Sequence, residues 1–64
     1  MILFAIYKNG FHKGNERAIN GNEAKKNYIV ASDLSDFLDD DDFLNQYVVK
    51  VALEGFHYNE NTVL

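Results

Sequence analysis

The sequence predicts an α+β fold, in which a small antiparallel sheet is covered on one face by one short acidic helix. Three observations predict it: two Asn-Gly pairs that follow strand-like runs, a helix start rich in aspartate, and a clean apolar–polar alternation over residues 47–54. Strands joined by tight turns are antiparallel, which excludes a parallel, doubly wound sheet. The expected element order is β-β-β-α-β within a single small domain, residues 1–64.

The first two expected strands form a hairpin. Residues 2–8 are apolar on both alternating faces, which is typical of a central strand. Asn9-Gly10 follows at once, and this pair favours a type I′ turn because both central residues need a positive φ. Residues 11–19 alternate only weakly, and Gly14 indicates a bulge or bend. We therefore expect a second strand at an edge of the sheet.

More than one structure is compatible with the region of the third expected strand. Asn20-Gly21 repeats the turn signal, and Tyr28 to Ala31 again have strand character. A helix over residues 22–27 is the alternative, since Glu, Ala and Lys favour helix. From the sequence, residues 11–27 are compatible with strand, helix or loop.

A helix is expected from residue 32 onward. Ser32 or Asp33 would cap its first turn, and four apolar residues share one face at helical spacing: Leu34, Phe37, Leu38 and Leu44. The contiguous aspartates of residues 39–42 oppose helix, because anions are unfavourable near a helix C-terminus. We expect the helix to stop or restart there, with Asp40 or Asp41 capping a second short turn that contains Phe43 and Leu44.

The last strand is predicted over residues 47–54, where every second side chain is apolar and those between them are of mixed polarity. Tyr47, Val49, Val51 and Leu53 face one side, which indicates a half-buried strand. Gly55 ends it. The remaining residues either form a short hairpin through residues 59–61 or stay loose.

Composition excludes several classes of function. The chain has 64 residues and no cysteine, which excludes disulfides, thiol nucleophiles and Cys-ligated metals. No phosphate-binding loop, nucleophile elbow or dinucleotide motif is present. We expect no enzyme, no metal and no cofactor.

The apolar run at the start is shorter than the about 20 residues that a membrane span needs, and it lacks the features of a signal peptide. A cytoplasmic protein without a membrane partner is expected, in the host cell if the protein is viral.

Charge is distributed unevenly along the chain. The net charge is −4, but residues 8–26 carry +3, whereas residues 33–60 carry −7. Phosphate contacts need clustered Lys and Arg, so an acidic chain is not expected to bind nucleic acid directly. It is suited to a partner with a basic surface.

The candidate partner-binding residues lie in and beside the acidic run. They are Asp33, Asp36, Asp39, Asp40, Asp41 and Asp42, with Phe37, Phe43 and Tyr47 as apolar anchors. Calcium is not expected, because a calcium loop needs alternating ligands, a glycine and a terminal glutamate. On a continuous helix the six carboxylates would span about 15 Å, a linear charge density comparable with duplex DNA. This density suggests a mimic of the nucleic-acid backbone.

In size and composition alone the chain resembles the accessory and anti-defence proteins of bacterial viruses, and no motif matches a named family. The resemblance implies a phage-type inhibitor that occupies the basic, nucleic-acid-binding surface of a host protein. The alternative is a structural homo-oligomer that pairs through a strand edge.

Gly-Phe-His occurs at residues 10–12 and 55–57, but two histidines fall short of the three protein ligands of a zinc site.

Overall fold

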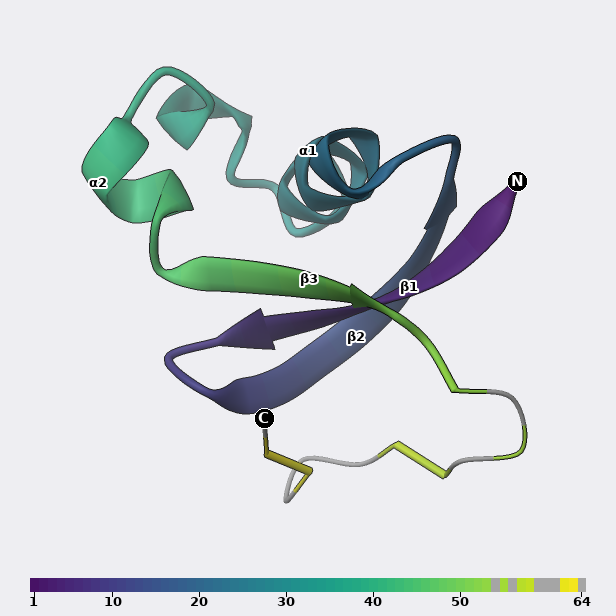
Figure 1. Ribbon diagram of the computed structural model, residues 1–64. Coiled ribbons are helices and arrows are strands. Elements are labelled where there is room, and N and C mark those ends of the chain that lie inside the picture. Colours follow the sequence, from purple (N-terminus) through teal and green to yellow (C-terminus); the bar gives the residue numbers. More distant parts are fainter. Residues whose placement is uncertain (54, 56, 59–61, 64) are drawn as a thin grey trace.

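A computed structural model describes residues 1–53, 55, 57, 58, 62 and 63, and Figure 1 shows their arrangement. The elements are β1 (Ile2–Lys8), β2 (Phe11–Ala18), α1 (Gly21–Ala31), the 3₁₀ helix η1 (Ser35–Phe37), α2 (Asp41–Leu44) and β3 (Tyr47–Val51). The three strands form an antiparallel sheet in the order β2-β1-β3. The predicted α+β class with a small antiparallel sheet is confirmed.

The hairpin between β1 and β2 is the one that the sequence predicts. Asn9 and Gly10 have φ values of 52° and 89°, as a type I′ turn requires. The register runs from Lys8 opposite Phe11 to Ile2 opposite Ala18, and it shifts between Ile6 and Tyr7. This shift leaves Lys13 as the extra residue of a β-bulge, directly before Gly14. The predicted irregularity near Gly14 is therefore confirmed.

Strand β1 is central and covered on both faces. Phe4 and Ile6 lie on the face that α1 covers, which we call the helical face. Ala5 and Tyr7 are also buried and lie on the opposite face, which we call the tail face. This double burial explains why residues 2–8 are apolar at every position. The predictions of a central first strand and of β2 at an edge are both confirmed.

The third predicted strand is wrong, because residues 21–31 form helix α1. Asn20 does not turn a hairpin. Its backbone is extended, and its side-chain Oδ1 accepts a hydrogen bond of 2.9 Å from the backbone N–H of Glu23. Asparagine serves both as a turn residue and as a helix N-cap, and a glutamate three residues later is typical of a cap. The helix that was the alternative over residues 22–27 is the correct assignment.

The helix predicted to begin at Ser32 is also wrong, since Ser32 is the C-cap of α1. Residues 33–44 instead form η1 and the four-residue α2. The helix that packs on the sheet is α1, and the acidic segment is not one continuous helix. The predicted restart is confirmed, because the side chain of Asp40 caps a short turn that contains Phe43 and Leu44.

The core lies between α1 and the helical face of the sheet. Its buried members come from all three strands and from α1: Phe4, Ile6, Ala18, Ala24, Ile29 and Tyr47. On α1, Ala24 and Tyr28 are four positions apart and Ile29 follows directly, so these three side chains form the stripe that packs on the core. Leu34, Leu38, Phe43 and Leu44 pack against the rim of this core. The acidic segment is therefore anchored by its own apolar side chains.

Strand β3 ends at Val51, three residues earlier than the sequence predicts, and Glu54 lies outside the described residues. Tyr47 is buried and Val49 half-buried, whereas Val51 and Leu53 are exposed. The chain then passes to the tail face (Figure 1), where Val63 bridges Phe11 and the carbonyl of Thr62 accepts from the backbone N–H of His12 at 2.8 Å. The expected turn at residues 59–61 lies outside the described residues.

Candidate functional site

The acidic segment begins where α1 ends. Asp33 adopts the left-handed conformation, with φ at 65°. Its backbone N–H donates to the carbonyl of Val30, and the N–H of Leu34 donates to that of Ile29, both at 3.0 Å. These two bonds define a Schellman motif, which reverses the chain at a helix end. Leu34 packs on the core beside buried Ile29, and this contact fixes the direction in which the acidic segment leaves α1.

Asp40 organises the second half of the segment. Its carboxylate accepts a hydrogen bond of 3.0 Å from the backbone N–H of Phe43, and it is the N-cap of α2. Asp41 and Asp42 lie in the first turn of α2, where the helix dipole favours negative charge. The contiguous aspartates are therefore compatible with this fold because they begin a helix. On one continuous helix that begins at Ser32 they would have stood near its C-terminus, which is why the sequence predicts that such a helix stops or restarts there.

We define the acidic surface as the six aspartates of residues 33–42, all of which are exposed. Within the described residues the ion pair that forms lies on α1, between Lys26 Nζ and Glu23 Oε1 at 3.9 Å. None of the six aspartates pairs with a cation in that part of the chain. Their charge is therefore not neutralised internally and is available to a charged partner.

An aromatic ladder connects the acidic surface to the core. The ring of Phe37 stacks on that of Phe43, with centroids 4.5 Å apart, and Phe43 packs on Tyr47 at 5.5 Å. Tyr47 continues to Tyr28 at 6.0 Å. The ammonium of Lys8 lies 5.5 Å from the Phe43 ring centroid and 5.6 Å from that of Tyr47, which is the range of cation–π attraction. Aromatic stacking and this cation hold Phe43 in place.

The three predicted aromatic anchors lie at different depths. Phe37 is 40% exposed, Phe43 is half-buried and Tyr47 is 5% exposed. Tyr47 is therefore a core residue that supports Phe43 and is not itself presented at the surface. Burial raises the pKa of Tyr47, and the neighbouring Tyr28 raises it further. The sequence did not indicate the stack, because Phe37 and Phe43 are six positions apart and match neither the helical nor the strand period.

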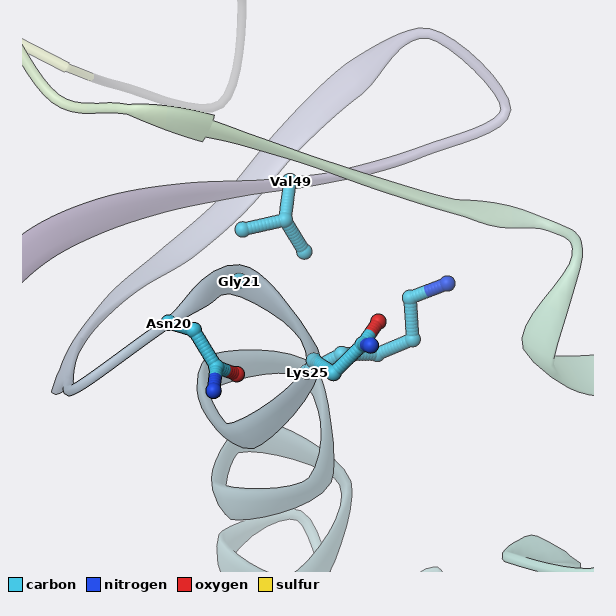
Figure 2. A pocket seen from close by; sticks show the side chains of 5 residues that line it. Asn20, Gly21, Lys25 and Val49 are labelled. Carbon is cyan, nitrogen blue, oxygen red and sulfur yellow. The ribbon is translucent and has the colours of Figure 1, made fainter.

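A hollow of about 320 Å³ separates the start of α1 from β3 (Figure 2). Asn20, Gly21, Asn22, Lys25 and Val49 line it. The Asn20 side chain is occupied in capping α1, and Lys25 Nζ donates a hydrogen bond of 3.2 Å to the carbonyl of Leu44. This bond ties the end of α2 to α1. Asn20 and Lys25 therefore serve the fold: the first caps α1, and the second holds the acidic segment against the helix.

The repeated Gly-Phe-His tripeptide does not gather metal ligands. No group of three His, Cys, Asp or Glu side chains within the described residues is arranged to hold a metal ion. His12 Nε2 lies 2.8 Å from Asn15 Oδ1, and the His12 ring stacks on Tyr58 with centroids 4.7 Å apart. His12 is thus part of the packing on the tail face.

Comparison of the chain with protein-family models, with curated proteins and with solved structures finds no match. Among the described residues, no helix has the length and apolar character to cross a membrane.

Proposed function

We propose that this protein is a small binding module that acts by occupying the basic, nucleic-acid-binding surface of a partner protein. The observation that carries the proposal is the acidic surface: six exposed aspartates without an ion pair among the described residues, next to the exposed ring of Phe37. Excess charge of one sign speeds the approach of an oppositely charged protein. An exposed aromatic ring supplies apolar contact area at the centre of an interface.

The acidic surface and Phe37 would have separate roles in such a complex. The carboxylates would steer association and pair with lysine and arginine, so the association rate would fall as salt rises. Phe37 would supply contact that salt does not screen. Because its ring stacks on Phe43, which in turn packs on Tyr47, Phe37 would lose little side-chain freedom on binding.

If the partner is an enzyme that binds nucleic acid, the complex would inhibit that enzyme. A protein bound over its basic surface would compete with the phosphate backbone, in the manner of a phage-type inhibitor acting in the host cytoplasm. The mimicry of DNA that the sequence suggests assumed a continuous helix, and η1 and α2 replace that helix. The proposal therefore depends on the gathered charge and not on a regular spacing of carboxylates.

The experiment is a capture of partners from a cell extract by the immobilised full chain, at low and at high salt. The double variant Asp41→Asn with Asp42→Asn removes two charges from the acidic surface. Its matched control, Glu16→Gln with Glu23→Gln, removes two charges from β2 and α1. We expect a partner that leaves at high salt, binds the first variant several-fold more weakly and binds the control normally. Captured partners should also be displaced by added DNA. Equal binding to both double variants would contradict the proposed role of the acidic surface.

A second candidate function is self-association through β3, and the structure of the sheet edge favours it. The carbonyl of Gln46 accepts from the N–H of Asn9, just after β1, and the N–H of Ala52 donates to the carbonyl of Leu3 in β1. In an antiparallel ladder the backbone groups of Val49 and Val51 therefore point away from the sheet. No strand within the described residues pairs with that side. Light scattering distinguishes the two functions: a 7.3 kDa monomer at all concentrations and salt levels would exclude self-association.

A further inference from the structure

The tail face of the sheet holds a second pocket, which the proposed function does not use. Its volume is about 420 Å³, within the range of about 300 to 1,000 Å³ that is typical of small-molecule sites. Tyr7 of β1, Lys50 and Val51 of β3, and Leu53 and Val63 beyond the sheet contribute to its lining. Tyr58 and Thr62 complete the lining, so the pocket combines three hydroxyl-bearing side chains, one cation and several apolar side chains.

Tyr7 presents an unusual polar group to this pocket. The residue is only 7% exposed, and its ring is held by an edge contact with His12 at 5.7 Å. Within the described residues the Tyr7 hydroxyl makes no hydrogen bond, and no fully buried side-chain oxygen there lacks one. Its small exposed remainder must therefore include the hydroxyl oxygen. Burial raises the pKa of Tyr7, with a further contribution from Tyr58, so the hydroxyl stays a proton donor at neutral pH.

Lys50 lies next to Tyr7 on the same face. Ala5 is opposite Lys50 and Tyr7 is opposite Val48, so Tyr7 and Lys50 are diagonal neighbours across β1 and β3. Diagonal neighbours lie within reach of long side chains. Lys50 is exposed, and in the part of the chain that the structure describes its ammonium has no ion-pair partner. The Lys50 ammonium, a cation, and the Tyr7 hydroxyl, a neutral donor, therefore meet at one pocket. Neither group forms an ion pair or hydrogen bond that stabilises the described part of the fold.

We propose that this pocket binds a small organic carboxylate with a short apolar chain. One carboxylate oxygen would accept from the Tyr7 hydroxyl, and the carboxylate would pair with the Lys50 ammonium. The apolar chain would cover Leu53 and Val63, both of which are exposed. The lining contains one cation, Lys50, which matches a monoanion. A phosphate dianion would be left with half of its charge unpaired, and phosphate sites normally add several backbone N–H groups.

Hexanoate is the probe, added to the full chain while backbone amide resonances are followed by NMR. Hexanamide has the same chain without the charge. Two variants remove one polar group each, Lys50→Gln the ammonium and Tyr7→Phe the hydroxyl. Lys13→Gln is the control, because Lys13 is an exposed lysine at the β2 bulge and does not line the pocket.

We expect hexanoate to shift the amides of Tyr7, Lys50 and Leu53 in a saturable way, and hexanamide to bind at least about tenfold more weakly. Each pocket variant should weaken hexanoate binding about tenfold, the usual effect of losing a hydrogen bond or pairing to a charged group. The control should bind normally. Equal binding of hexanamide, no saturable shift, or an equal loss in Lys13→Gln would overturn the proposal. If Tyr7→Phe does not fold, exposed Lys50→Gln still decides the matter.

Discussion

The rings of Phe37 and Phe43 stack with an interplanar angle of 22°, although Phe37 belongs to η1 and Phe43 to α2. The stack holds η1 against α2 and gives the acidic surface its shape. Only Phe43 continues inward, to buried Tyr47. The two phenylalanines should therefore respond differently to truncation.

Phe37→Ala should lower the free energy of unfolding by about 1 kcal/mol, since it loses one stacking contact and part of a half-exposed ring. Phe43→Ala should cost about 2 to 3 kcal/mol, because it also leaves a cavity above Tyr47. Urea denaturation followed by circular dichroism measures both. If the ring of Phe37 is the anchor of a complex, Phe37→Ala should nevertheless weaken partner capture strongly. Equal destabilisation by the two variants would mean that both rings are structural.

Asp40 separates the effect of a helix cap from that of charge. Asp40→Ala should lower the free energy of unfolding by about 1 kcal/mol, because the N–H of Phe43 loses its acceptor. Asp40→Asn keeps the cap and removes the charge, and should remain within a few tenths of a kcal/mol of the parent. The comparison uses urea midpoints at neutral pH. A loss in the asparagine variant as large as that in the alanine variant would show that charge and not capping stabilises α2.

Gly14 is required by the close approach of α1 to β2. A Cβ added at Gly14 would lie 2.9 Å from Cε1 of Tyr28, which is too close for carbon atoms. Gly14→Ala should therefore lower the free energy of unfolding by about 1 to 3 kcal/mol. In a Tyr28→Leu background, where the ring is absent, the same change should cost clearly less. Additive effects in this double-mutant cycle would contradict the steric explanation.

Two tyrosines should make the fold sensitive to alkaline pH. Burial is the main cause that raises the pKa of Tyr7 and of Tyr47 above their ordinary value of 10.0. Above that pH the unfolded chain loses these protons more readily than the folded one. The stability they contribute is full below about pH 10 and falls as the pH rises toward their folded pKa values.

Urea titrations between pH 8 and pH 11 measure this loss. Tyr47→Phe cannot ionise at that position, so its stability should fall less steeply than that of the parent over the same range. Lysines titrate there in both proteins and cancel in the comparison. Identical slopes for the two proteins would show that the Tyr47 hydroxyl ionises as easily in the folded state as in the unfolded one.

The sequence predicts the β1–β2 hairpin and β3 because their signals are local. Asn9-Gly10 needs no tertiary context to form a turn. The same dipeptide at Asn20-Gly21 was misleading, since asparagine also caps helices and here its side chain accepts from the backbone N–H of Glu23. Residues 28–31 resemble a strand in composition, but Tyr28 and Ile29 contact the sheet from a helix. Packing on the sheet outweighs their weak preference for strand.

The acidic surface was predicted residue by residue, because aspartates that run together are exposed in almost any fold. Three residues of the aromatic ladder were expected as apolar anchors, but their contacts with one another were not predicted. Tyr47 is buried because α1 lies over β3. Phe37 meets Phe43 because of the path that the chain takes from η1 to α2. The pocket on the tail face depends on the chain returning beneath the sheet. Contacts of this kind join distant residues and leave no periodic signal in the sequence.

Strand β1 pairs with β2, which follows it in the chain, and with β3, which comes only after α1, η1 and α2. Phe4 is opposite Val51. During synthesis both strands of the β1–β2 hairpin are made early, but a hairpin of two strands alone is only marginally stable in water. The sheet gains its third strand only after the acidic segment has been made. A ribosome-bound chain that stops before Val51 would therefore lack a stable tertiary structure, and folding would be completed in one late, cooperative step.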